Sequence, residues 1–344
     1  MPSQIIHVLA GRSALVSSGI LDNSIITAAF NLGCQGPDIF SHNRRTKPFA
    51  LAYSRLLHRQ NYGRFCRIIG SILLKRRFPS LESWFYGFVT HQIVDRIFHP
   101  YVINRSFVSG STNIAGISPA HFHAFFERIL DVRVLEDVAG LTLGDFDTGE
   151  PFKLPESDIS ELSLWIASAL GEAYPDEIPE DSEAQLRVDN AFRDTIYFYE
   201  VTNPVLTNMK RSTGCTDIQR YVEWGTGGAA LLFPEFQDLS VDWLNSGRKP
   251  WQHPVNGEWY TLSVKDLYQK AVDEAVVIHR TVSSFFDGAL TPEKLEEAVG
   301  NECLSVSGTD GRIGTVRFFD SFDLGSTLLD QVEKRKEWLA RALC

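Results

Sequence analysis

Three residues that commonly bind metal ions recur at four-residue intervals between positions 91 and 99. His91, Asp95 and His99 lie in the stretch SWFYGFVTHQIVDRIFHP, residues 83–100. On a helix, side chains four residues apart lie one above the other, so these three form a single row. Two imidazoles and a carboxylate on adjacent helical turns are typical ligands of a divalent cation.

The rest of this stretch is apolar nearly all round, so the expected helix lies in the middle of a domain. Charged groups in such an interior cost several kcal/mol unless they are paired, and a metal ion is the commonest partner for His and Asp in this arrangement. The alternative is a buried His–Asp hydrogen-bonded pair with a capping histidine. Pro100 is expected to end the helix, because the residue before a proline disfavours helical angles.

Other candidate ligands also lie in the first part of the chain, where seven of the nine histidines precede residue 124. The candidates are His7, Asp38 in a GPD turn, His58, and the i, i+4 pair His123 and Glu127. Singly, each has an ordinary structural explanation, such as helix capping by an aspartate. Together they favour a metal site built from His and carboxylate without thiolate, which is the ligand set of hydrolytic zinc sites. His42 remains an alternative to His58, and His121 remains a weaker alternative to His123.

Composition and charge restrict the functional classes. The chain has 344 residues and a formal net charge of −10, which argues against a general nucleic-acid binder and against a polybasic membrane anchor. Its five cysteines show no CxxC spacing, so a reducing compartment is expected. The N-terminus lacks the features of a signal peptide, and no apolar run approaches the ~18 residues of a membrane span. We therefore expect a cytoplasmic protein.

Helical periodicity dominates the chain and predicts an all-α protein. Expected helices cover residues 5–21, 25–32 (capped by Asp22 to Ser24), 47–75, 120–135 (opened by Ser118-Pro119), 159–174, 183–199, 264–283 and 326–343. Residues 33–38 are expected to form a turn, and residues 303–319 a hairpin around Asp310-Gly311. The GTGG run at 225–228 is interpreted as packing or a turn, because no strand pattern or P-loop lysine accompanies it.

The order His7, GPD, His58, HxxxDxxxH and HxxxE resembles the zinc-dependent phospholipase C family. That family includes bacterial phosphatidylcholine-hydrolysing enzymes, lecithinase toxins and the N-terminal domain of glycosylphosphatidylinositol-specific phospholipase D. It shares an all-helical fold and a three-metal site with P1-type nucleases. The chain is most similar to the leaderless bacterial members, with convincing motifs over residues 1 to about 135 and softer similarity over 185–280.

The resemblance implies a multi-helix bundle over residues 1–204, with a mostly helical extension over 205–344 packed on it. It implies two or three Zn²⁺ ions. Asp38, His58, His91 and Asp95 would hold the first ion, His7 with bridging Asp95 the second, and His99, His123 and Glu127 the third. In the secreted enzymes an N-terminal tryptophan also binds the second metal, whereas this chain starts Met1-Pro2.

The function expected from this resemblance is hydrolysis of a phosphate ester, such as a phospholipid, by a metal-bound hydroxide that attacks phosphorus. Asp38 and Asp95 are the expected catalytic residues, with Asp38 as a possible proton acceptor for the attacking water. Core packing is favoured over substrate contact for the aromatic run at Trp84 to Tyr86. A non-catalytic, metal-stabilised helical scaffold is one alternative. A P1-type nuclease is another, although the acidic balance counts against it.

Overall fold

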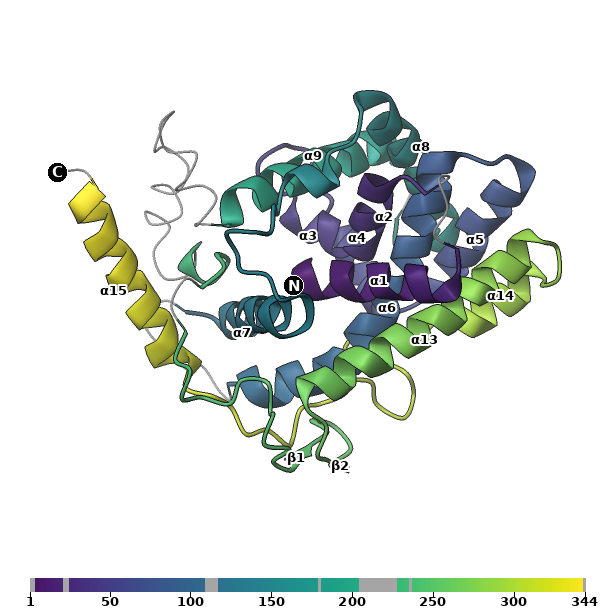
Figure 1. The fold of residues 1–344 in the computed structure, drawn as a ribbon. Coiled ribbons are helices and arrows are strands. Elements are labelled where there is room, and N and C mark those ends of the chain that lie inside the picture. Colours follow the sequence, from purple (N-terminus) through teal and green to yellow (C-terminus); the bar gives the residue numbers. More distant parts are fainter. Residues whose placement is uncertain are drawn as a thin grey trace.

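The computed structural model describes residues 4–20, 25–108, 117–178, 181–203, 228–234 and 237–342. The predicted all-α fold is confirmed (Figure 1). The helices are α1 (Gln4–Ser18), α2 (Thr27–Cys34), α3 (Asp38–His42), α4 (Leu51–Arg59), α5 (Tyr62–Lys75), α6 (Pro79–Ser106), α7 (Pro119–Val134), α8 (Glu156–Ala173), α9 (Ala184–Thr202), α13 (Val264–Phe286), α14 (Pro292–Val299) and α15 (Leu324–Ala342). Two short antiparallel strands, β1 (Trp251–Gln252) and β2 (Trp259–Tyr260), pair Trp251 with Tyr260.

Helix α6 is the central element of the bundle, and α1, α2, α5, α7, α8 and α13 all pack against it. Its first half, with Trp84 and Phe88, belongs to one large apolar cluster, whereas Phe98 and Tyr101 in its second half belong to another. The aromatic run at Trp84 to Tyr86 is buried in the core, as expected. A helix buried on nearly all sides can present its one polar row only inside the protein.

Helices α2 and α6 touch through their backbones. A Cβ atom added at Gly33 would lie 2.0 Å from the carbonyl oxygen of Trp84, and one added at Gly87 would lie 2.1 Å from that of Phe30. Glycine is therefore needed at both positions, because any side chain would push the helices apart. This close approach brings the turn after α2, and Asp38 beyond it, against the polar row of α6.

Two predictions about helix boundaries were wrong. Pro100 lies inside α6 and does not end it. The helix continues because Tyr101 and Val102 are buried in the core, and this burial outweighs the ~3 kcal/mol that proline costs inside a helix. The single helix expected over 47–75 is two helices, α4 and α5, separated at Asn61, whose φ of 60° is in the left-handed region that asparagine tolerates.

The predicted hairpin also needs correction, and one C-terminal helix was not predicted. Residues 303–319 contain a single isolated bridge, Ser307 to Ile313, and no regular strand pair. The sequence analysis missed α14, although Thr291 caps it and Pro292 opens it. Residues 22–24, the expected cap of the second helix, and most of the GTGG run lie outside the described residues.

The C-terminal helices pack directly on the N-terminal part of the chain. Helix α13 lies against α1 and α6, and α14 lies against α5 (Figure 1). Leu295 and Val299 of α14 and Phe285 of α13 share the apolar cluster of the first half of α6. Within the described residues, none of these helices is both long and apolar enough to cross a membrane.

Candidate metal centre

The structure brings all eight predicted ligands together at one place in the bundle. They come from α1, α3, α4, α6 and α7, and they are His7, Asp38, His58, His91, Asp95, His99, His123 and Glu127. We call His7, Asp38, His58, His91 and Asp95 the inner group, and His99, His123 and Glu127 the outer group. Asp95 lies between the groups, because its Oδ2 is 3.8 Å from His99 Nδ1.

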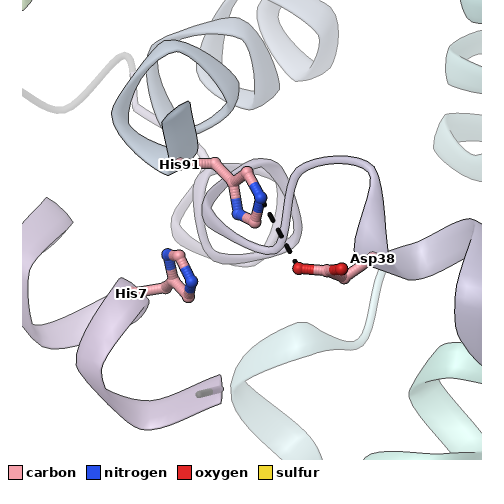
Figure 2. A group of neighbouring side chains, drawn as sticks. All are labelled: His7, Asp38 and His91. Atoms are coloured by element: carbon pink, nitrogen blue, oxygen red, sulfur yellow. Dashed lines mark ion pairs between the residues drawn. The ribbon is translucent and has the colours of Figure 1, made fainter. Parts of the chain in front are cut away.

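The inner group converges on two carboxylates. Asp38 lies 3.2 Å from His58 Nε2 and 3.5 Å from His91 Nε2. Asp95 lies 3.3 Å from His7 Nε2 through one oxygen, and 3.1 Å from His91 Nε2 through the other. Figure 2 shows His7 and His91 close to each other, with Asp38 beside them, and the two imidazole rings stack with their centroids 4.4 Å apart. Two sets of three possible ligand atoms, His7–Asp38–His91 and His58–His91–Asp95, each lie within 4.8 Å of one another.

The outer group is formed where α6 and α7 face each other. His123 and Glu127 are four residues apart on α7, with His123 Nε2 3.1 Å from Glu127 Oε1. His99 Nε2 lies 3.8 Å from the same oxygen. These three residues also form a set of possible ligand atoms within 4.8 Å.

Hydrogen bonds to backbone carbonyls orient three of the histidines. Nδ1 of His58 lies 2.7 Å from the Ser54 carbonyl oxygen, Nδ1 of His91 lies 3.1 Å from that of Cys34, and Nδ1 of His99 lies 2.7 Å from that of Leu304. A carbonyl can only accept, so each Nδ1 carries the proton and donates it. In the neutral imidazole the Nε2 lone pair then faces the carboxylates. This arrangement is typical of histidines that bind a metal through Nε2.

Several buried atoms of the inner group make no hydrogen bond. They include His91 Nε2 and the two carboxylate oxygens near it, Asp95 Oδ2 at 3.1 Å and Asp38 Oδ2 at 3.5 Å. Buried polar atoms without partners are costly, by about 1–3 kcal/mol each. A cation among them would satisfy all three at once, so the residues present fit the binding of divalent metal ions.

The carboxylates of the centre are held in their charged form. Burial would raise the pKa of Asp38, but the neighbouring His58 and His91 outweigh burial and lower it to about 2. Burial is likewise outweighed at Asp95, where His91 and His99 hold the pKa well below its usual value. The pKa of Glu127 is lowered by His123 in spite of burial. All three groups therefore offer anionic oxygens at neutral pH.

Neighbouring residues position the ligands. Gly36, at φ 53°, lets the turn after α2 pass close to His91, because a Cβ atom there would lie 2.3 Å from the imidazole ring. Asp131, on α7, accepts the backbone N–H groups of Ile5 and Ile6 at 3.0 and 2.8 Å. It thereby caps the first turn of α1, which carries His7, and joins that turn to the helix of the outer group.

The two alternative histidines lie outside both groups. His42 is buried, with its ring stacked 4.4 Å from that of Phe198, and burial lowers its pKa to about 3. His121 caps α7, where its Nδ1 accepts the N–H of Ser118 at 3.1 Å. The geometry therefore favours His58 over His42 and His123 over His121.

The sequence analysis missed Asp131 and the carbonyl groups that orient the histidines. A backbone carbonyl belongs to every residue type, so no sequence pattern identifies Leu304 or Cys34 for this role. Asp131 could have been found from its spacing, because it follows His123 and Glu127 at four-residue intervals and so lies in the same row on α7.

A buried group of carboxylates and carbonyl-oriented histidines is typical of metal-dependent proteins of the hydrolytic type. Residues 6–175 match the model of the zinc dependent phospholipase C family, and this part of the chain belongs to that family. The resemblance seen in the sequence is thereby confirmed at the level of the family. No curated protein and no solved structure matches the chain.

Proposed function

We propose that the chain is a zinc-dependent phosphodiester hydrolase of the phospholipase C type, with two or three ions bound by the inner and outer groups. The observation that carries this proposal is the convergence of eight candidate ligands, with three histidines oriented by carbonyls so that Nε2 faces the carboxylates. The family match over residues 6–175 supports the reaction class.

The charge of the loaded centre favours an anionic substrate. The ligands include three carboxylates, Asp38, Asp95 and Glu127. Two divalent ions would leave one excess positive charge, and three ions would leave three. A phosphodiester carries one negative charge, so the buried centre would attract it strongly at low effective dielectric.

Bound zinc ions would lower the pKa of a coordinated water and polarise phosphoryl oxygens, which is the chemistry that this reaction needs. The chain's own residues orient the reactants. With a pKa near 2, Asp38 accepts a hydrogen bond and positions an O–H group, but it is too weak a base to retain a proton at neutral pH. Asp95 belongs to the inner group and lies between the two groups, 3.8 Å from His99.

Substrate would approach from the side of His58 and His123. Their side chains are 22% and 21% exposed, whereas those of the other six ligands are at most 8% exposed. A metal-stabilised scaffold without turnover would show the same low exposure. The experiment below therefore also tests this second candidate function.

Metal analysis and substrate assays together test the proposal. Purified protein should contain at least two zinc ions per chain by elemental analysis, and it should hydrolyse a chromogenic phosphocholine ester. Chelation should abolish hydrolysis, and zinc should restore it. A full zinc complement without turnover of the phosphocholine ester, a phosphomonoester or single-stranded DNA would favour the scaffold, while preferred cleavage of DNA would favour the nuclease.

A further inference from the structure

The segment at the end of α14, residues 299–304, lies outside the part of the chain that matches the family. It crosses the end of α4, the start of α5 and the middle of α6, and its main chain is bonded to all three. Two of the candidate metal ligands, His58 and His99, are among the residues that it contacts.

Its first contacts are with the corner between α4 and α5. The carbonyl of Gly300 accepts the N–H of Gly63 at 2.9 Å, and Asn301 Oδ1 accepts that of Arg64 at 2.9 Å. Helix α5 has no side-chain cap of its own at Asn61, so the 299–304 segment serves as its cap. The N–H of Leu304 is donated to the carbonyl of His58 at 2.9 Å, which fixes the main chain that carries this ligand.

Its other contacts are with α6. Arg96, next to Asp95 in sequence, donates to the carbonyls of Val299 and Glu302 at 2.9 Å each. His99 donates its Nδ1 proton to the carbonyl of Leu304 at 2.7 Å, so this segment determines which nitrogen of His99 faces Glu127. One short peptide therefore holds a ligand of the inner group and a ligand of the outer group.

We propose that the 299–304 segment is a positioning element of the metal centre, supplied by the C-terminal part of the chain. It fixes the tautomer and ring orientation of His99 and the backbone at His58, as outer-shell partners do in other metal sites. The inference rests on the proposed zinc centre. It assigns to the C-terminal part a role in metal affinity that packing alone would not require.

Gly63 offers a way to displace the segment without changing any ligand. A Cβ atom there would lie 2.5 Å from the carbonyl oxygen of Glu296 and 2.9 Å from that of Gly300, so the segment must shift. In Gly63→Ala we expect zinc affinity at the outer group to fall by 10- to 100-fold, in the order of magnitude found for outer-shell partners. Asn301→Ala, which removes the cap of Arg64, should act in the same direction and replaces Gly63→Ala if that variant does not fold.

Two control variants separate positioning from general stability. Gly171→Ala on α8 introduces the same substitution where nothing lies within 4 Å, and it should leave zinc affinity unchanged. Val282→Ala, on α13, creates a cavity in the core but removes none of the hydrogen bonds between the segment and α4, α5 and α6. It should therefore lower the melting temperature of the zinc-free protein but not zinc affinity.

Zinc affinity would be measured by competition with a chromophoric chelator and compared at matched zinc-free stability. If Gly63→Ala and Asn301→Ala bind zinc as tightly as Val282→Ala does, the segment is only structural and the inference is overturned. If the wild-type protein binds no zinc, the proposed function itself fails, and this result is distinct from the first.

Discussion

Replacing Asp95 by asparagine is the most direct test of the proposed centre, because this carboxylate belongs to the inner group and also lies close to His99 of the outer group. Its oxygens lie 3.3 Å from His7, 3.1 Å from His91 and 3.8 Å from His99. Asparagine has nearly the same shape, so core packing is preserved. What is lost is the negative charge and one anionic ligand atom for each ion that Asp95 would bridge.

The expected effect is large. Binding of a structural zinc by four ligands is worth about 10–16 kcal/mol, or roughly 2.5–4 kcal/mol for each ligand. At 1.4 kcal/mol for each factor of ten, losing one ligand weakens binding by about 10²–10³-fold at each bridged ion. Asp95→Asn should therefore bind at least one zinc ion fewer at micromolar zinc, and it should lose the hydrolytic activity that depends on the centre.

Asp194→Asn is the matched control. Asp194 is also a buried aspartate, but it accepts the backbone N–H groups of Arg45 and Thr46 at 2.8 and 2.9 Å, outside both groups. Its replacement should lower stability and leave the zinc content unchanged. Zinc would be counted by elemental analysis and its affinity determined by chelator competition. An Asp95→Asn protein with the wild-type zinc count and affinities within threefold would refute the reasoning.

Four further outcomes are expected. His58→Ala should reduce zinc content, whereas His42→Ala should not, and calorimetric zinc titration of the two variants distinguishes them. Asp131→Ala should lower the free energy of unfolding by about 1–2 kcal/mol through loss of the α1 cap and should weaken the inner group, as measured by urea denaturation with and without zinc. Burial lowers the pKa of His279 from 6.5 to about 4, so the unfolded chain takes up the proton first as the pH falls. The free energy of unfolding should therefore fall by about 2 kcal/mol between pH 7 and pH 5 through this residue. In zinc-free His279→Gln the free energy of unfolding should fall correspondingly less over this range. Zinc present at about 1,000 times its Kd stabilises the folded protein by about 4 kcal/mol for each ion, and the melting temperature of a chain of this size shifts by about 2 °C for each kcal/mol. Chelation should therefore lower the melting temperature by about 8 °C for each ion removed. A melting temperature that does not depend on zinc would contradict this.

The local part of the centre was predictable from the sequence, because its signals are local. The i, i+4, i+8 row of α6 and the i, i+4 pair of α7 depend only on helical periodicity, and both form as expected. Apolar residues all round the row correctly placed α6 in the interior. That these eight residues bind metal stays a prediction.

The parts that failed depend on contacts between distant segments. Pro100 fits inside α6 because residues beyond it are buried by tertiary packing, which its own neighbours in sequence do not reveal. The carbonyl that orients His99 comes from a residue 205 positions further along the chain. Helix α14, which places that carbonyl, is short and weakly apolar, so its periodicity alone did not identify it.

The protein could balance its buried carboxylates in two ways, by protonating histidines or by binding cations, and His91 and His99 differ in how far protonation can contribute. Burial opposes protonation of His91, but Asp95 and Asp38 outweigh it and raise the pKa of that imidazole. At His99 burial prevails over Asp95 and Glu127, and the pKa is lowered. A neutral His99 whose Nδ1 proton is committed to Leu304 presents a lone pair, not a proton, toward Glu127. Protonation of His99 therefore does not balance this carboxylate at neutral pH. Its remaining neighbour in the outer group is His123, at 3.1 Å, and a cation between His99, His123 and Glu127 would contact all three residues.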